Sequence, residues 1–118
     1  MATHKDLEVW KESIELVTEI YKITSKFPDS EKFGLTSQMN RSAISVPSNI
    51  AEGASRGTNK EYVYFLNISL GSLSELETQI IISHNLGFVN SLDILKDLEQ
   101  IRAKLYKLRN YLKSKIKA

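Results

Sequence analysis

Apolar residues recur every three or four positions along four stretches of this chain, with polar residues between them. This spacing places the apolar side chains on one face of an α-helix. The pattern predicts helices at about residues 4–27, 36–56, 59–86 and 91–115. In the last of these, the apolar face consists of Ile94, Leu98, Ile101, Leu105, Leu108, Leu112 and Ile116.

The first stretch carries two apolar rows, which is more apolar surface than one seam between helices needs. The surplus either widens the face toward the core or buries against another molecule. One row is Leu7, Trp10, Ile14, Val17 and Tyr21, and the other is Val9, Leu16, Ile20, Ile23 and Phe27.

Residues that start or end helices separate the four stretches. In a capping box, two side chains three positions apart each satisfy a free amide at a helix start. Proline and glycine are typical of helix ends. The boxes are Thr3 with Asp6 and Thr58 with Glu61; the helix-ending residues are Pro28, Gly57 and Gly87; and Asn90 or Ser91 can cap the fourth helix.

Four amphipathic helices joined by short connections have one economical arrangement. Short loops make sequential helices antiparallel, and each apolar face must be buried against the others. The length of 118 residues is suited to one domain. We therefore predict an all-α fold, an up-down-up-down four-helix bundle spanning residues 1–118.

Pro47 lies inside the second predicted helix. It lacks an amide and its ring crowds a carbonyl one turn earlier, which costs about 3 kcal/mol in a helix interior. We expect the helix to bend there, or to stop near Ser45 and restart. Either the bend serves packing, or freed carbonyls line a pocket together with Asn49, Glu52 and Arg56.

Gly53 stands where helix propensity favours alanine, which suggests that another backbone approaches closely. The third stretch offers a matching set of small residues. We therefore expect residues 47–53 to pack closely on that set, which consists of Ser69, Gly71, Ser72 and Ser74.

Charged residues in the second and third stretches suggest ion pairs. Glu52 precedes Arg56 by four positions, the favourable order for a pair within one helix. Arg41, Glu52 and Glu75 could instead form buried pairs between helices, which would hold the helices in register.

Composition excludes several classes of protein. The chain has no cysteine, so disulfides, thiol catalysis and thiolate metal sites are excluded. No apolar run approaches the roughly 20 residues of a membrane span, and the first ten residues are polar rather than signal-like. We expect a cytoplasmic protein without a membrane contact.

The net charge of +2 is unevenly distributed. Residues 1–90 carry 8 basic and 11 acidic side chains, whereas no acidic residue follows Gln100. Cations interleaved with tyrosines suit the phosphates and bases of RNA or DNA. The alternative is a solvated basic helix end that faces the negative carbonyl pole. The candidate residues are Arg102, Lys104, Lys107, Arg109, Lys113, Lys115 and Lys117, beside Tyr106 and Tyr111.

Catalytic patterns are missing from the sequence. His84 is the only histidine outside the N-terminal tail, and the paired Glu-x-x-His motifs of di-iron bundles do not occur. Neither a phosphate-binding glycine loop nor a nucleophile elbow is found. We expect no catalytic residue, no metal site, no cofactor and no enzyme activity.

The second and third stretches contain the segments FGLTSQMNRSAISVPSNIAEGASR and EYVYFLNISLGSLSELETQI. These resemble the four-helix-bundle proteins encoded within intervening sequences of bacterial 23S ribosomal RNA genes, sometimes labelled S23 ribosomal proteins. Where that family often has a second basic residue before Arg41, this chain has Asn40. The matching positions include Arg41, Pro47, Asn49, Glu52, Gly53, Arg56, Gly71 and Glu75.

The resemblance implies a homo-oligomer, with a ring-shaped pentamer as the expected assembly. A distantly similar group assists reverse transcriptases of diversity-generating retroelements and binds nucleic acid. That kinship is an analogy only. From the basic residues of the fourth helix we expect a homo-oligomer that binds RNA or DNA through that helix. The alternative is an oligomeric scaffold or accessory protein that binds an unknown protein partner without touching nucleic acid.

Overall fold

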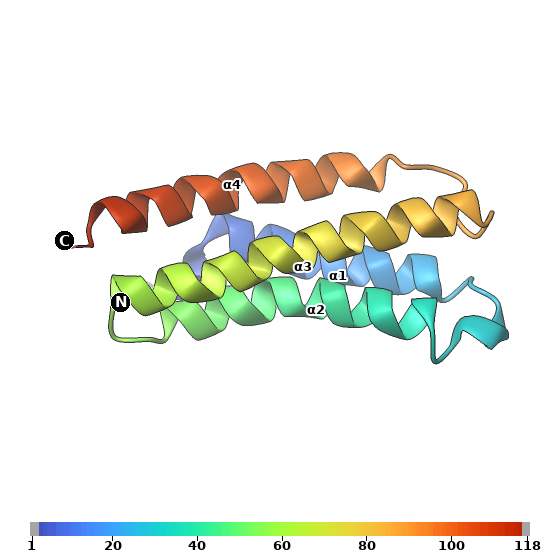
Figure 1. Cartoon of the computed structure of the whole chain (residues 1–118), viewed down its shortest axis with the longest axis horizontal. Helices are drawn as coiled ribbons and strands as arrows, with labels where there is room; N and C mark the ends of the chain where they lie inside the picture. Colours follow the sequence, from blue (N-terminus) through green and yellow to red (C-terminus); the bar gives the residue numbers. More distant parts are fainter. Residues whose placement is uncertain (1–2, 117–118) are drawn as a thin grey trace.

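The computed structural model describes residues 3–116, which form four long α-helices and two short 3-10 turns (Figure 1). The helices agree with the predicted ones to within a few residues at each end. In chain order, the elements are η1 (His4–Asp6), α1 (Glu8–Thr24), η2 (Asp29–Glu31), α2 (Leu35–Ala54), α3 (Asn59–Asn85) and α4 (Ile94–Ser114).

Each helix runs opposite to the one before it, so the chain passes along the long axis four times (Figure 1). Each helix packs on the next one along the chain, and α1 also packs on α4, which closes the bundle. The molecule measures 49 × 22 × 20 Å. The predicted all-α four-helix bundle is confirmed. Because the number of long helices is even, η1 and the last turn of α4 lie at the same end (Figure 1).

The core is a column of aliphatic side chains contributed by all four helices. Burying one such leucine or isoleucine side chain contributes about 1.5–3 kcal/mol to folding. Fully buried members of the column are Ile20, Met39, Val46, Ile50, Leu66, Leu73, Leu76, Ile80, Leu98, Ile101 and Leu105.

Of the helices in the described part of the chain, none has both the length and the apolar character needed to cross a bilayer.

Only one of the two apolar rows of α1 enters this column. Leu16 and Ile20 are buried, whereas Ile14 and Tyr21 in the other row are 40% and 45% exposed. The outer row therefore keeps much of the surplus apolar surface that the sequence indicates.

The capping box at the start of the chain forms, but on a different element from the one expected. The Thr3 amide donates to Asp6 Oδ2 over 2.9 Å, and the Lys5 amide donates to Thr3 Oγ1 over 3.2 Å. These bonds close the 3-10 turn η1, after which Leu7 adopts an extended backbone. The prediction of a helix from residue 4 is wrong, because α1 begins only at Glu8.

The start and end of α3 were correctly predicted. Thr58 Oγ1 accepts the Glu61 amide over 3.1 Å at the start. At the other end Gly87 has a φ of 81°, which suits glycine, and its amide donates to the His84 carbonyl over 3.0 Å. The Phe88 amide closes the turn on a carbonyl further back, so α3 ends in a Schellman motif.

Two other boundaries differ from the prediction. The second helix ends at Ala54 rather than at Gly57, because the Ser55 amide and hydroxyl already bind carbonyls of the last turn. The fourth helix begins at Ile94, later than expected. Ser91 does accept an amide, that of Asp93 over 3.0 Å, but this bond lies in the connection before the helix.

Pro47 does not interrupt α2, which continues through it. The alternative of a stop near Ser45 and a restart is therefore wrong, and the bend stays a prediction. Neighbouring carbonyls gain extra donors: Ser69 Oγ of α3 donates to the Val46 carbonyl over 2.9 Å, and Asn49 Nδ2 donates to the Ser45 carbonyl over 2.8 Å.

Gly53 lies directly against α3, as its lack of a side chain suggests. A Cβ at this position would stand 2.9 Å from Tyr62 Cδ1, 3.0 Å from Phe65 Cβ and 3.2 Å from the Tyr62 carbonyl oxygen. These separations are shorter than ordinary van der Waals contact. Glycine therefore permits the close approach of α2 and α3 at this end.

The predicted small-residue set is not what lies against Gly53, whose neighbours on α3 are Tyr62 and Phe65. Only half of the set contacts α2, and its hydrogen bonds are with Ser45 and Val46. Ser69 and Ser72 are buried against α2, and Ser72 Oγ donates to Ser45 Oγ over 2.8 Å. Gly71 and Ser74 are exposed, and a Cβ at Gly71 would meet no atom within 4 Å. Their inclusion was wrong, because they lie on the outer side of α3.

Candidate nucleic-acid interface

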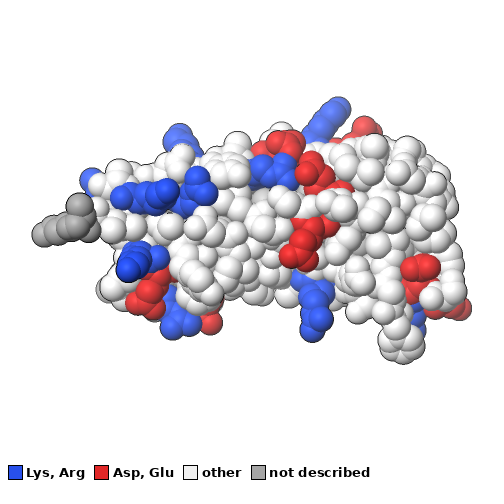
Figure 2. Space-filling model, in the orientation of Figure 1, with Lys and Arg blue, Asp and Glu red and all other residues white. Residues whose placement is uncertain are grey.

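From Lys107 to Lys115, the predicted cations lie along the C-terminal half of α4. The helix turns its apolar residues inward, which leaves the intervening basic residues at the edges of that buried face. Figure 2 shows Lys and Arg side chains gathered over this end of α4, with acidic side chains nearer the middle of the same face.

Arg102 holds α4 to α3 and is not part of an open surface. Its side chain is only 16% exposed, and Nη2 lies 3.3 Å from Glu77 Oε1 of α3. A second ion pair joins it to Glu99 one turn earlier. Because two carboxylates already pair with Arg102, we leave it out of the proposed binding surface.

Lys104 makes the corresponding link from α4 to α1. Its Nζ lies 3.2 Å from Glu8 Oε1 and is also hydrogen-bonded to Glu12. The hydrogen bond to Glu12 raises the pKa of Lys104 above its ordinary value of 10.5, with Glu8 adding to the effect. Lys104 therefore stabilises the seam between two helices, and it too leaves the candidate set.

Four of the predicted cations remain available for binding. Lys107 and Lys113 are exposed, and within residues 3–116 neither forms an ion pair, nor do Arg109 and Lys115. Lys117 lies outside the described residues. We call the remaining set the basic α4 surface; it consists of Tyr106, Lys107, Arg109, Tyr111, Lys113 and Lys115.

Two tyrosines on this surface carry a cation against the ring. The Arg109 guanidinium lies 4.8 Å from the centre of the Tyr106 ring, and Lys115 Nζ lies 5.3 Å from that of Tyr111. The two tyrosine residues are 41% and 59% exposed. The arrangement offers positive charge for phosphates and aromatic faces for bases.

Polar residues around Pro47 do not converge on a pocket. The Asn49 amide donates to Ser45 of its own helix. Glu52 and Arg56 form the predicted pair within α2, at 3.6 Å, and both are exposed. The hypothesis of a polar site in this helix is therefore wrong, because its side chains bind one another.

The predicted ion pairs between helices also involve other residues. Arg41 and Glu75 are exposed, and neither enters an ion pair in the part of the chain that the structure covers. The pairs that do link helices beyond the α2–α3 turn are those of Arg102 and Lys104.

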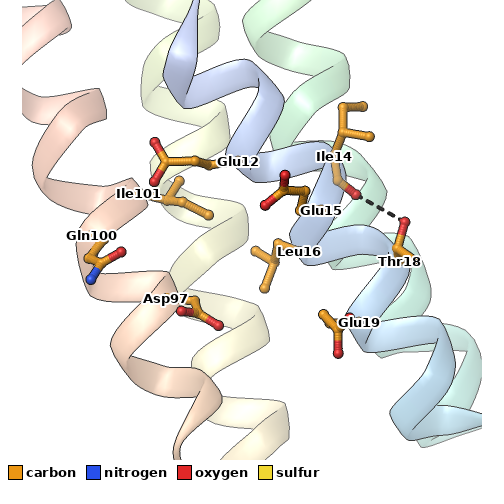
Figure 3. Close-up of a pocket in the computed structure, with 9 residues that line it drawn as sticks. All are labelled: Glu12, Ile14, Glu15, Leu16, Thr18, Glu19, Asp97, Gln100 and Ile101. Atoms are coloured by element: carbon orange, nitrogen blue, oxygen red, sulfur yellow. Dashed lines mark hydrogen bonds between the residues drawn. The ribbon is translucent and has the colours of Figure 1, made fainter.

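Sequence reasoning missed an acidic recess between α1 and α4 (Figure 3). Its volume is about 380 Å³, with Leu16 and Ile101 among the lining residues. The spacing of Glu12, Glu15 and Glu19 along α1 could have revealed it. Among the described residues, no group of three or more His, Asp or Glu side chains could hold a metal ion. Because carboxylates of Glu12, Glu15, Glu19 and Asp97 line it, the recess disfavours binding of a phosphate.

The outer apolar row of α1, which the sequence predicts, lines an apolar groove whose other wall, on α2, it does not predict. The outer row of α1 meets Ile44, which is 41% exposed, and Pro47 of α2 along this groove. We call it the α1–α2 groove; it is lined by Trp10, Ile14, Val17, Tyr21, Ile44 and Pro47.

Comparison with known proteins adds a family and a fold. Residues 5–113 match the family described as "23S rRNA-intervening sequence protein". Among curated proteins, none matches this chain. A solved structure from Bacteroides thetaiotaomicron VPI-5482, described as a protein with unknown function from the S23 ribosomal protein family, is 23% identical. The alignment covers 93% of this chain and 99% of that chain, with a TM-score of 0.62, which supports the shared fold.

Proposed function

This chain belongs to the family of 23S rRNA-intervening sequence proteins, and from that premise we propose that it is a non-enzymatic, cytoplasmic protein that self-associates and binds RNA or DNA. Its binding site is the basic α4 surface. The assembly is a homo-oligomer, a ring of five being the form that the resemblance implies.

One observation supports the nucleic-acid contact above the others. Within residues 3–116, Lys107, Arg109, Lys113 and Lys115 lie together at one end of α4 without a carboxylate partner, beside two exposed tyrosines. Each phosphate that a cation neutralises releases counterions, which favours binding at low salt. Self-association would repeat this surface in every copy and strengthen binding to a long strand.

Binding at two salt concentrations tests the proposal. We expect a labelled RNA or DNA oligonucleotide to bind at about 50 mM salt and to bind much more weakly at about 200 mM. If four cations each contact a phosphate of a single strand, the affinity should fall on the order of 50-fold. An absence of binding at both concentrations would contradict the proposal.

Matched lysine variants locate the site. The triple variant Lys107→Gln, Lys113→Gln, Lys115→Gln should lose most of the affinity and show a shallower salt dependence. The control, Lys26→Gln, Lys32→Gln, Lys96→Gln, removes the same charge from exposed positions elsewhere. Equal losses in the two variants would show that net charge, and not this surface, is responsible.

A second candidate function is suggested by the α1–α2 groove. Exposed apolar side chains that line a groove are typical of a surface that binds protein. In this alternative the chain is an oligomeric scaffold or accessory protein that binds a partner without contacting nucleic acid. This alternative predicts that the lysine triple variant keeps the function of the wild type in the cell.

A further inference from the structure

The two tyrosine–cation pairs of the basic α4 surface lie on opposite edges of the exposed side of α4. An α-helix turns by about 100° per residue, so Tyr106 and Tyr111 point about 140° apart. The Tyr106 edge faces α3, since Arg109 Nη1 reaches Asn67 Oδ1 over 3.2 Å. Tyr111 lies two turns after Lys104, which binds Glu8 and Glu12 of α1. The Tyr111 edge therefore faces α1.

The strip between the two edges carries small or short polar side chains. Ala103, Asn110 and Ser114 are exposed along it, and Lys107 lies beside them. No acidic residue follows Gln100, so nothing on this strip repels a phosphate backbone. The strip is thus a smooth, positively charged path with an aromatic ring at each side.

Each cation orients its tyrosine. With the cation on one face of the ring, the opposite face stays available, as the exposure of 41% for Tyr106 and 59% for Tyr111 indicates. A ring that is already held in place loses less conformational freedom when a base stacks on it. Such a ring can reach only an unpaired base, because a duplex stacks its base faces inside the helix.

We infer that the basic α4 surface binds single-stranded nucleic acid in preference to duplex. This inference rests on the proposed function. The strand crosses α4 over Asn110, with its backbone near Lys107 and one base stacked on each of Tyr106 and Tyr111. Toward the start of α4, the strand is excluded by the acidic recess, whose carboxylates include Glu15, Glu19 and Asp97 (Figure 3).

Binding of three matched probes tests the preference. The probes are one sequence as single-stranded RNA, single-stranded DNA and the DNA duplex, each measured at about 50 mM salt. Stacking of one base is worth about fivefold to a hundredfold in affinity. We therefore expect at least one of the single strands to bind about tenfold or more tightly than the duplex. The ratio between the RNA and DNA strands identifies the preferred sugar.

Tyrosine variants test the stacking itself. The variant Tyr106→Leu, Tyr111→Leu should bind single strands about tenfold or more weakly while its duplex affinity stays unchanged. The variant Tyr106→Phe, Tyr111→Phe keeps the rings and should bind like the wild type. The control Phe33→Leu removes a ring that is 90% exposed and has Lys32 against it, outside both α4 and the α1–α2 groove, and it should change neither affinity. Thermal unfolding of each variant checks that it is folded.

The outcomes separate this inference from the proposed function. If no probe binds at low salt, the proposed function fails. If duplex binds as tightly as both single strands, or if the leucine variant binds single strands like the wild type, the basic surface stands and the stacking inference is overturned.

Discussion

At the scale of single residues, similar side chains have different roles, because they contact different partners in the neighbouring helices. Arg102 and Lys104 meet carboxylates on α3 and α1 and so join helices. Lys107, a few positions on, meets none among the described residues. The two helical glycines differ in the same way: Gly53 is enclosed by α3, whereas Gly71 faces open space.

The glycine pair gives a direct test of the α2–α3 contact. Gly53→Ala should lower the free energy of unfolding by about 1–2 kcal/mol, because crowding against Tyr62 outweighs the gain in helix propensity. Gly71→Ala, the control, should raise it by about 0.5–1 kcal/mol, since only the propensity changes. Urea unfolding of the two variants measures both. A stabilised Gly53→Ala would show that the helices do not approach closely there.

At the scale of helices, the sequence predicted what depends on neighbours along the chain. The Thr58 cap and the Gly87 turn involve residues within five positions, so local patterns suffice. The partners of Arg102 and Lys104 lie 25 and 92 residues away, and depend on the register between helices. The acidic recess could not be predicted from the sequence for the same reason, because it forms only where α1 and α4 lie side by side.

The Lys104 link should make the α1–α4 seam sensitive to alkaline pH. The pKa of Lys104 is raised in the folded chain, so the folded state binds this proton more tightly than the unfolded state. The stabilisation is therefore complete below 10.5 and is lost as the pH rises through the raised pKa. Wild type should be more stable than Lys104→Gln at about pH 8, and the difference should shrink at about pH 11.

The matched control for this measurement is Lys107→Gln, which removes an exposed lysine from the same helix. Its stability should differ little from that of the wild type at either pH. Denaturant unfolding in parallel buffers provides the comparison. A difference between wild type and Lys104→Gln that stays constant across this range would show that the link to Glu8 and Glu12 does not depend on the lysine charge.

At the scale of the whole molecule, three kinds of surface occupy different places. The basic α4 surface lies at one end (Figure 2), and the acidic recess lies between α1 and α4 (Figure 3). The α1–α2 groove presents apolar side chains. Periodicity alone identified the two apolar rows of α1. It did not distinguish the buried row from the outer one, because both repeat with helical spacing and only tertiary packing separates them.

Under the proposed function, in which no second protein occupies it, the α1–α2 groove is the surface on which we expect self-association. Light scattering should give a mass well above the 13.4 kDa of one chain. The variant Ile14→Glu, Ile44→Glu should shift the protein toward that monomer mass, because it places charge in an apolar contact. The control Ile81→Glu, Ile82→Glu changes isoleucines of similar exposure, 40% and 44%, on α3. A wild-type monomer, or equal dissociation of both variants, would contradict this.

The even number of helices has a practical consequence for handling the protein. A tag or fluorophore fused at either terminus would stand at the end of the bundle that holds η1 and the last turn of α4, where it would hinder an oligonucleotide on the basic α4 surface. The connection between α3 and α4, at the opposite tip, is the better attachment point. Because the chain has no cysteine, a single one introduced near Asn90 could be labelled with a maleimide dye at that position alone.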